Sequence, residues 1–321
     1  MTDPVSAPPR APRSPQVKKI RRDVSGWIVL DKPVGLTSTH AVAIAKRLFN
    51  AKKAGHAGTL DPLATGLLPL AFGEATKTVP FVMDGEKAYR FTVKWGEQTE
   101  SDDADGKVVA RSDLRPTQEA IEDCLPLFIG EIQQVPPRFS ALKIDGERAY
   151  DLARDGEMVD LAPRAVVITA LRLIESDEET ATFEAECGKG TYVRAIARDM
   201  GRMLGCLGHV TALRRTRVGP FEEADAVSLD DLRAAGEAGE ASDALAACLR
   251  PVESALSELA EVRVSRHEAQ RLMNGQAVIL RGRDAPVHLG AVYVTEAGRL
   301  IALAEADKGQ LVPKRAFHLP G

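Results

Sequence analysis

The sequence has few cysteines, and they are spread too widely to hold a metal ion or a disulfide framework. Four are present, with no C-x-x-C pair and no histidine cluster beside any of them: Cys124, Cys187, Cys206 and Cys248. Zinc sites and disulfide-stapled domains use closely and regularly spaced cysteines. We therefore expect these thiols to behave as small buried hydrophobic groups in a reducing compartment.

Long apolar runs are also missing. No stretch approaches the roughly 18 to 20 apolar residues needed to cross a bilayer, and hydrophobic residues make up an ordinary 44% of the chain. The first residues, "MTDPVSAPPRAPRSPQ", are polar and proline-rich where a signal peptide has an apolar core. These absences favour a cytoplasmic protein with no membrane partner.

Nucleotide and metal motifs are absent as well. The sequence contains no G-x-x-x-x-G-K-[ST] loop and no cluster of residues at metal-ligand spacing. Any chemistry that this protein performs is therefore expected to use side chains alone, with no cofactor and no metal.

The net charge of −4 hides an uneven distribution. Residues 220–261 contain eleven acidic residues against Arg233 and Arg250, whereas residues 189–217 contain seven basic residues against Asp199 alone. A local positive field attracts a polyanion whatever the total charge is. The basic segment thus indicates nucleic-acid binding, which the net charge alone would argue against.

The chain is predicted to begin with a tail and then to fold. The first 22 residues are proline-rich and end in the basic run "KKIRR", which is typical of a disordered segment, so residues 1–24 are expected to form a tail. Trp27–Leu30 then predicts a short strand, and the following segment predicts a helix capped by Ser38 or Thr39.

Residues 25–255 are expected to form an α+β domain. Large apolar residues alternate with polar ones from Tyr89 to Trp95, which is the period of a half-buried strand. Further elements are expected at 117–128 (helix), 166–174 and 180–187 (strands) and 192–204 (helix). Strands interspersed with helices, without regular βαβ spacing, favour a mixed, mainly antiparallel sheet.

Residues 256–321 are expected to form a small β-rich domain. A short helix at His267–Met273 precedes "GAVYVTEAGRLIALAEA", which indicates two strands joined by a glycine turn, and "LVPKRAF" indicates a last strand. The acidic, alanine-rich stretch "AAGEAGEASDALAAC" before this domain indicates a surface insertion.

Residues 55–66, "GHAGTLDPLATG", display one carboxylate on a loop. The glycines permit backbone angles that other residues avoid, and Pro62 disfavours the helical conformation at Asp61. We expect neither a regular helix nor a regular strand here. An aspartate before proline is most often a turn former or a cap, so this loop alone does not assign a reactive group.

Other segments supply partners for that carboxylate. Arg194 stands at the start of a predicted helix in "GKGTYVRAIARDMG", where an arginine would keep a neighbouring aspartate ionised and aimed. Tyr89 could stack on a flat ring and Leu213 could wall a pocket, although in isolation both residue types more often serve the core.

Four segments together resemble the TruB family of bacterial tRNA pseudouridine-55 synthases. They are "LDKPVGLTS", "GHAGTLDPLATGLLPLAFGEATK", "FSALKIDGERAYDLAR" and "GTYVRAIARDMG", in the family's order across about residues 26–219. The resemblance implies an enzyme that flips one uridine out of the T arm of tRNA and isomerises it to pseudouridine. It also implies a PUA-like RNA-binding β-barrel for residues 256–321 and a T-loop-binding insertion at about 136–164.

The resemblance also implies roles for particular residues. Asp61 corresponds to the nucleophile, Tyr89 to the tyrosine that stacks on the base and takes part in the chemistry, and Arg194 to the arginine that pairs with the aspartate. The remaining matches receive or contact the everted nucleotides: His56, Tyr192, Leu213 and Asp103. The attack on C6 of the base and the attack on C1′ of the sugar both fit a single carboxylate.

Three other functions compete with this interpretation. A glycoside hydrolase normally needs a second carboxylate, and none accompanies Asp61 in its loop. An RNA-folding helper would bind tRNA with chemistry secondary, and the catalytic subunit of a guide-RNA particle would use a similar domain. The segments above favour a stand-alone enzyme, expected to be a monomer with tRNA as its partner and no required protein partner.

Overall fold

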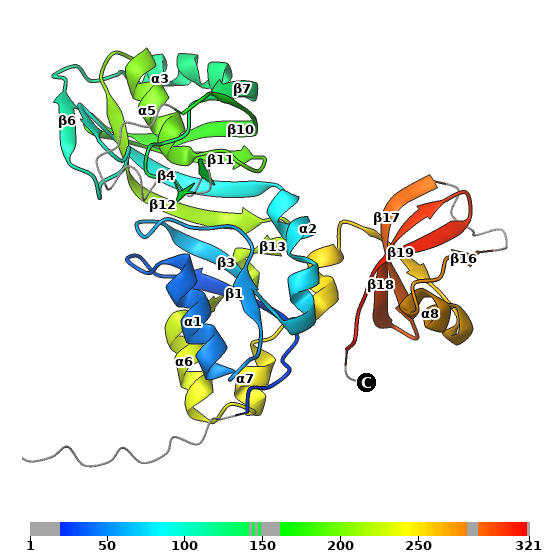
Figure 1. Cartoon of the computed structure of the whole chain (residues 1–321). Helices are drawn as coiled ribbons and strands as arrows, with labels where there is room; N and C mark the ends of the chain where they lie inside the picture. Colours follow the sequence, from blue (N-terminus) through cyan, green and yellow to red (C-terminus); the bar gives the residue numbers. More distant parts are fainter. Residues whose placement is uncertain (1–19, 141–142, 145–146, 149–160, 281–287, 320–321) are drawn as a thin grey trace, which may run out of the picture.

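The computed structural model describes residues 20–140, 143–144, 147–148, 161–280 and 288–319. The chain forms a large part built on one long sheet and a smaller part built on a second sheet, joined by a short connection (Figure 1). The predicted tail lies largely outside the described residues, as does most of the predicted insertion at 136–164.

The first sheet has ten strands and is mixed but mainly antiparallel, as predicted. Only the pairs β1/β14 and β3/β12 are parallel. The main path is β14 (Val227–Ser228), β1 (Gly26–Lys32), β3 (Thr65–Phe72), β12 (Gly208–Val218), β4 (Lys87–Trp95), β11 (Thr180–Cys187), β10 (Arg164–Ser176) and β7 (Gly130–Gln134). The short strands β2 (Ala54–His56) and β13 (Phe221–Glu222) pair with β3 and β12.

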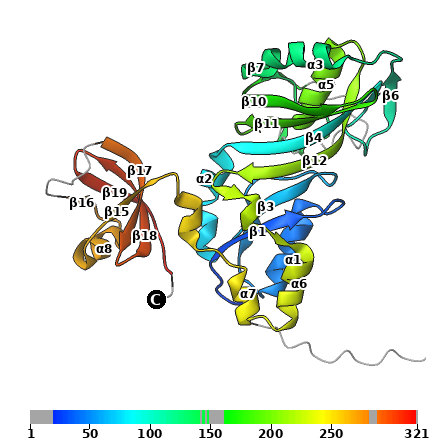
Figure 2. The ribbon, with the colours of Figure 1, turned by 180° about the vertical axis from the view of Figure 1, so that it is seen from behind.

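Helices lie along both halves of this sheet. Near the β10 end are α3 (Gln118–Cys124) and η2 (Leu125–Phe128), and near the β1 end are α1 (Ser38–Leu48), α6 (Leu229–Glu237) and α7 (Asp243–Ala247), whereas α5 (Val193–Met203) packs against the central strands β12 and β4 (Figures 1 and 2). The connection to the second sheet runs past α2 (Val79–Asp84) and η4 (Val252–Leu256); η1 (Gly73–Lys77) and η3 (Glu223–Asp225) are short turns. The hairpins β5 (Glu97–Thr99)/β6 (Val108–Arg111) and β8 (Lys143–Ile144)/β9 (Glu147–Arg148) stand apart from the sheet.

The alternating pattern of β4 produces the core of the first domain. Phe91, Val93 and Trp95 are fully or almost fully buried. The ring of Phe183 on β11 stacks on Phe91 at 5.3 Å and meets the edge of Trp95 at 6.4 Å. Each such buried side chain contributes about 1.5 to 3 kcal/mol of transfer free energy, so this cluster fixes β4 against β11.

The loop that carries Asp61 is bounded by strands that the sequence did not predict. Gly55 and His56 pair with β3 as part of β2, and Thr65 and Gly66 begin β3, so the irregular loop spans only residues 57–64. The loop is therefore tied at both ends to the central sheet.

Gly66 lies where no other residue fits. Its φ is +92°, and an added Cβ would lie 2.2 Å from the carbonyl oxygen of Arg215 and 2.9 Å from its nitrogen on the neighbouring β12. The clash and the unfavourable backbone angle would each cost roughly 1 to 3 kcal/mol.

We predict that Gly66→Ala lowers the free energy of unfolding by about 3 kcal/mol, measured by urea denaturation. Gly35→Ala is the matched control, because Gly35 has a φ of +79° but no atom within 4 Å of the position that an added methyl group would take. That variant should lose only about 1 kcal/mol, the cost of the backbone angle. Equal losses in the two variants would show that the approach of β12 does not constrain position 66.

The helix cap of α1 differs from the prediction. Thr37, rather than Ser38 or Thr39, is the N-cap, and its hydroxyl accepts the backbone N–H of His40 at 3.2 Å. Ser38 is buried instead, and its hydroxyl accepts from the N–H of Leu60 and donates to the carbonyl of Leu60, at 2.9 and 3.0 Å. The serine is thus committed to the loop that carries Asp61.

The chain enters the first domain and leaves it at neighbouring positions, near Trp27 and Arg250. The backbone N–H of Trp27 donates to the carbonyl of Arg250 at 2.9 Å, and the N–H of Arg250 donates to the carbonyl of Trp27 at 2.7 Å. Arg22 also bridges to Ala51, and Val24 is buried. Residues 22–24, assigned to the tail from sequence, therefore lie against the first domain.

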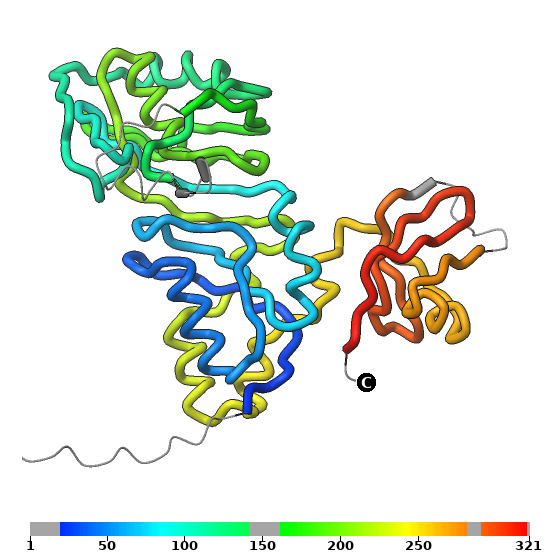
Figure 3. Tube along the Cα trace, viewed as in Figure 1, coloured from blue at the N-terminus to red at the C-terminus, as the bar shows by residue number. Residues whose placement is uncertain are grey.

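The second sheet has five strands and curls into a half-barrel, which is consistent with the predicted PUA-like β-barrel (Figure 3). Its order is β15 (Ala260–Arg263), β17 (His288–Glu296), β18 (Arg299–Asp307), β19 (Gln310–Ala316) and β16 (Val278–Ile279), with α8 (Arg266–Met273) beside it. The turn between β17 and β18 uses positive φ at Ala297 and Gly298, as the glycine-turn prediction requires. Among the described residues, no helix is both long and apolar enough to cross a membrane.

Candidate active site

Buried polar side chains form hydrogen bonds with the backbone of the loop at residues 57–64. Lys32 donates its Nζ to the carbonyl of Pro62 at 3.4 Å and to two carbonyls of its own loop. Arg215 donates Nη2 to the carbonyl of Gly58 at 3.1 Å and Nε to the carbonyl of Leu67 at 2.8 Å. With the Ser38 bonds to Leu60, these contacts fix the backbone on both sides of Asp61.

Arg194 meets Asp61 from the opposite half of the sheet. Its Nη2 lies 2.9 Å from Oδ2 of Asp61, and its Nη1 lies 3.2 Å from Oδ2 of Asp103. The guanidinium also donates to the carbonyls of Ser101 and Phe139, at 2.9 and 2.8 Å, and only 4% of the side chain is exposed. Arg194 is thus fixed by three groups besides Asp61, so it orients the carboxylate rather than following it.

Burial raises the pKa of the Asp61 carboxyl above its ordinary value, and the charge of Asp103 acts in the same direction. The Arg194 charge and hydrogen bond and the more distant Lys32 charge oppose this shift without cancelling it. The Asp61 side chain is 37% exposed, so its carboxylate is only partly desolvated. A partly desolvated, paired carboxylate is more basic and less well hydrated than one in water, and both properties favour its use as a nucleophile.

Asp103 lies behind Arg194 and does not line the cavity. It is 4% exposed, and its neighbour Asp102 pairs with Arg198, one helical turn after Arg194, at 3.1 Å. Arg198 also donates Nη2 to the carbonyl of Val135 at 2.8 Å. Two successive arginines of α5 therefore anchor the same acidic loop.

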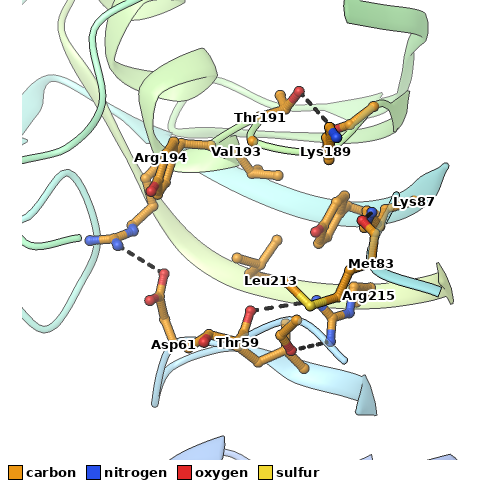
Figure 4. A pocket seen from close by; sticks show the side chains of 16 residues that line it. Thr59, Asp61, Met83, Lys87, Lys189, Thr191, Val193, Arg194, Leu213 and Arg215 are labelled. Carbon is orange, nitrogen blue, oxygen red and sulfur yellow. Dashed lines mark hydrogen bonds and ion pairs between the residues drawn. The ribbon is translucent and has the colours of Figure 1, made fainter. Parts of the chain in front are cut away.

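Asp61 lines a cavity of about 320 Å³ at the centre of the sheet (Figure 4). Figure 4 shows Asp61 and Arg194 joined at one end, with Lys87 and Met83 toward the other and Leu213 between. Of the predicted site residues, five line this cavity: Asp61, Tyr89, Tyr192, Arg194 and Leu213. The volume suits a flat ring with its sugar, not an extended chain.

The two tyrosines of the cavity keep their phenol protons at neutral pH. Burial raises the pKa of Tyr89, against the opposing effect of Arg215, and burial likewise raises the pKa of Tyr192. Gln134 fixes the backbone of Tyr192 by accepting its N–H at 2.8 Å and donating to its carbonyl at 3.2 Å. Both phenols can therefore act as hydrogen-bond or proton donors.

His56 is not among the residues that line the cavity. It lies in β2, half-buried, and its Nδ1 has no hydrogen-bond partner within the described residues. Burial, and then the charge of Arg215, lower the pKa of this imidazole. His56 is therefore a neutral side chain next to the loop and outside the cavity into which Asp61 projects.

Among the buried cations that sequence reasoning missed, two donate hydrogen bonds to the backbone of the loop that carries Asp61. Lys32 is fully buried, and desolvation lowers its pKa to about 8, with Asp61 opposing the shift. Arg215, 2% exposed, lines the cavity beside Tyr89. Lys32 stands in the segment "LDKPVGLTS" and Arg215 in the basic segment 189–217, both noted from the sequence, but their contacts depend on β1, β3 and β12 being neighbours.

Family profiles match successive parts of the chain. Residues 46–193 match the N-terminal domain of the TruB family pseudouridylate synthases, 194–257 match a tRNA pseudouridylate synthase B C-terminal domain, and 260–317 match the C-terminal region of pseudouridine synthase II TruB. A protein of Bradyrhizobium diazoefficiens named tRNA pseudouridine synthase B is 63% identical over 308 residues, covering 95% of this chain and 89% of its own. The chain belongs to the TruB family. Membership places it among the enzymes that isomerise uridine to pseudouridine.

Other TruB relatives and a solved structure agree. The Agrobacterium fabrum protein of the same name is 54% identical over 311 residues, covering 95% of this chain and 99% of its own. A chain in the crystal structure of a Cbf5-Nop10-Gar1 complex superposes with a TM-score of 0.70 at 26% identity, covering 91% of this chain and 85% of the other. The TruB fold of this protein therefore includes both of its sheets.

Proposed function

We propose that this protein isomerises uridine 55 in the T arm of tRNA to pseudouridine, with Asp61 as the nucleophile. The observation that carries the proposal is the 2.9 Å contact between Asp61 and the fixed guanidinium of Arg194 at one end of the central cavity. The names of the relatives at 63% and 54% identity support tRNA as the substrate.

Different residues of the cavity wall make different contacts with the everted nucleotide. A base inside a folded loop can be reached only after it leaves the stack, which costs a few kcal/mol. Tyr89 offers a face on which the base stacks, worth about 1 to 3 kcal/mol. Leu213 and Tyr192 exclude water from the other sides. Asp61 then forms a bond to the nucleotide, the N1–C1′ bond breaks and the uracil turns. C5 bonds to C1′ as Asp61 is released; C5 loses its proton and N1 gains one, so the product is an isomer of the substrate.

The direct test is to incubate the protein with unmodified tRNA transcript and to map pseudouridine along it. We expect conversion at the T-arm uridine and none in a transcript with cytidine at that position. Conversion at another uridine would assign a different substrate position, and no conversion at all would refute the proposal.

Tyr89 is expected to serve both stacking and proton transfer, and two variants separate these roles. Tyr89→Phe keeps the ring, so it should leave RNA affinity unchanged and slow single-turnover conversion by about 10²-fold or more. Tyr89→Ala loses the stack as well and should also weaken binding by about tenfold. Equal rates for wild type and Tyr89→Phe would show that the phenol hydroxyl takes no part in the reaction.

The tRNA-synthase proposal is preferred to a guide-RNA particle on identity. The chain in the Cbf5-Nop10-Gar1 complex is 26% identical, far below the relatives named tRNA pseudouridine synthase B. We propose that residues 25–255 form the catalytic domain, with a T-loop-binding insertion at about 136–164. Residues 256–321 then form the RNA-binding PUA-like domain. In this proposal the protein acts as a monomer.

A further inference from the structure

A strip of basic side chains crosses the junction between the two domains, away from the Asp61 cavity. We call it the junction strip; its members are Arg22, Lys52, Lys53 and Arg299. Two adjoining cavities, of about 290 and 480 Å³, bring them to one groove and share Asp23, Ser25 and His318. The groove is built by both domains, since Arg299 lies in the second sheet and the other three in the first domain.

The acidic groups of this groove are already paired. Asp23 forms an ion pair of 2.6 Å with Lys52. Burial alone would raise the pKa of Glu74, but hydrogen bonds from Lys77 Nζ and from the backbone N–H of His318, both 2.7 Å, bring it below its ordinary value. Lys53 and Arg299 are exposed and have no acidic partner within the described residues. The groove therefore presents uncompensated positive charge.

The positive surface continues along the end of α1. A neighbouring cavity of about 470 Å³ is lined by three basic residues, Arg21, Lys46 and Arg47, and by one acidic residue, Glu240. Lys46 and Arg47 stand in the last turn of that helix. The first residue of α1, Ser38, binds the loop that carries Asp61. Lys46 and Arg47 stand eight and nine residues after Ser38, and a rise of about 1.5 Å per residue places them roughly 13 Å from that loop.

The groove is preformed, because the two domains share one hydrophobic cluster. Trp27 and Val252 of the first domain pack in it with Leu303 and Phe317 of the second. Lys77 donates to the carbonyl of Ala316 at 2.8 Å, and its ammonium lies 5.6 Å from the ring of Phe317. A contact of this kind keeps Arg299 at a constant distance from Lys53.

We propose that the junction strip binds the phosphate backbone of the RNA stem that extends from the nucleotides held at the Asp61 cavity. This inference rests on the proposed function for its substrate class, RNA. Lysines and arginines on an exposed surface without aromatic platforms bind phosphates by charge and read no sequence. The strip thus measures how far a duplex extends from the T loop, whereas the cavity recognises the uridine.

The test compares hairpins that share the T loop but have stems of increasing length. The charge-reversed variant Lys53→Glu/Arg299→Glu is set against Arg233→Glu/Lys308→Glu, which makes the same charge change, one residue in each domain, at exposed positions outside the groove. We expect the first variant to bind the longest hairpin and full tRNA about tenfold more weakly, and to reduce the salt slope of log K by about 2. The shortest hairpin should bind all three proteins equally. Lys53→Gln/Arg299→Gln should give an intermediate loss.

Three results would overturn the inference: equal loss for short and long stems, equal loss in the control variant, or no loss. Failure of the proposed function is a separate outcome, because it is read from pseudouridine mapping with wild-type protein. A protein that leaves the T-arm uridine unchanged but still shows strip-dependent binding of long stems would retain the junction strip and lose the assigned chemistry.

Discussion

Replacing Asp61 with asparagine is expected to reduce the single-turnover conversion of tRNA by at least about 10⁴-fold while leaving its affinity within about threefold of wild type. The amide has nearly the same shape, so the cavity, the stack on Tyr89 and the phosphate contacts remain. It lacks the nucleophilic oxygen, so no bond to the nucleotide forms. Residual conversion within 100-fold of wild type, on the order of 3 kcal/mol in barrier, would exclude Asp61 as the nucleophile.

The same variant should melt at a temperature no lower than wild type at pH 7. The pKa of Asp61 is raised in the folded protein, so the folded state holds this proton to higher pH than the unfolded state does. Stability is therefore lost as pH rises through the window between the ordinary value and the raised one. Asparagine removes that loss, and Arg194 keeps Asp103 and two carbonyls as partners. A large drop in melting temperature would show that Asp61 has a structural role.

Replacing Arg194 with methionine should reduce kcat/KM at pH 7 by at least about 100-fold, because the Asp61 carboxylate loses the guanidinium that orients it, and a misplacement of about 1 Å costs about that factor in rate. Arg194 lowers the pKa of Asp61, so its loss raises that pKa further. Activity requires the ionised carboxylate and falls as pH drops through its pKa. The acid limb of the pH profile should therefore move to higher pH, and Arg194→Lys should restore part of the shift.

Arg198→Met provides the control for that prediction. Arg198 lies one turn along α5, is equally buried and makes the same kinds of bonds, to Asp102 and to the carbonyl of Val135, but it does not touch Asp61. Both methionine variants should lower the melting temperature. Only the Arg194 variant should move the acid limb, and an equal shift in both would reduce Arg194 to a structural residue.

Patterns along the chain were sufficient for the parts of the fold that depend on local periodicity. The strand from Thr180 to Cys187 has the predicted bounds, and the helix predicted at 192–204 begins and ends within one residue of α5. Capping at Thr37 was missed because the competing serine is taken by a distant carbonyl, that of Leu60. Local rules cannot rank two adjacent hydroxyls when one has a tertiary partner.

Some residues of the site could likewise be predicted from the sequence, and others could not. The resemblance to a known family supplied Asp61, Tyr89 and Arg194, and the structure brings them to one cavity. It does not bring His56 to that cavity, and it places Asp103 behind Arg194. The buried cations Lys32 and Arg215 were missed, because a lysine or arginine in a sequence gives no sign that carbonyl groups from other strands will replace its water. Three-dimensional neighbours decide those contacts.

The paired backbones of Trp27 and Arg250 carry one more consequence. Because Trp27, near the start of the catalytic domain, and Arg250, near its end, are hydrogen-bonded neighbours, the two ends of this domain lie side by side. Its ends could be joined and new ends opened in a surface turn without stretching any strand. Appended segments would also emerge on the side of β1, leaving the opening beside Asp61 unobstructed.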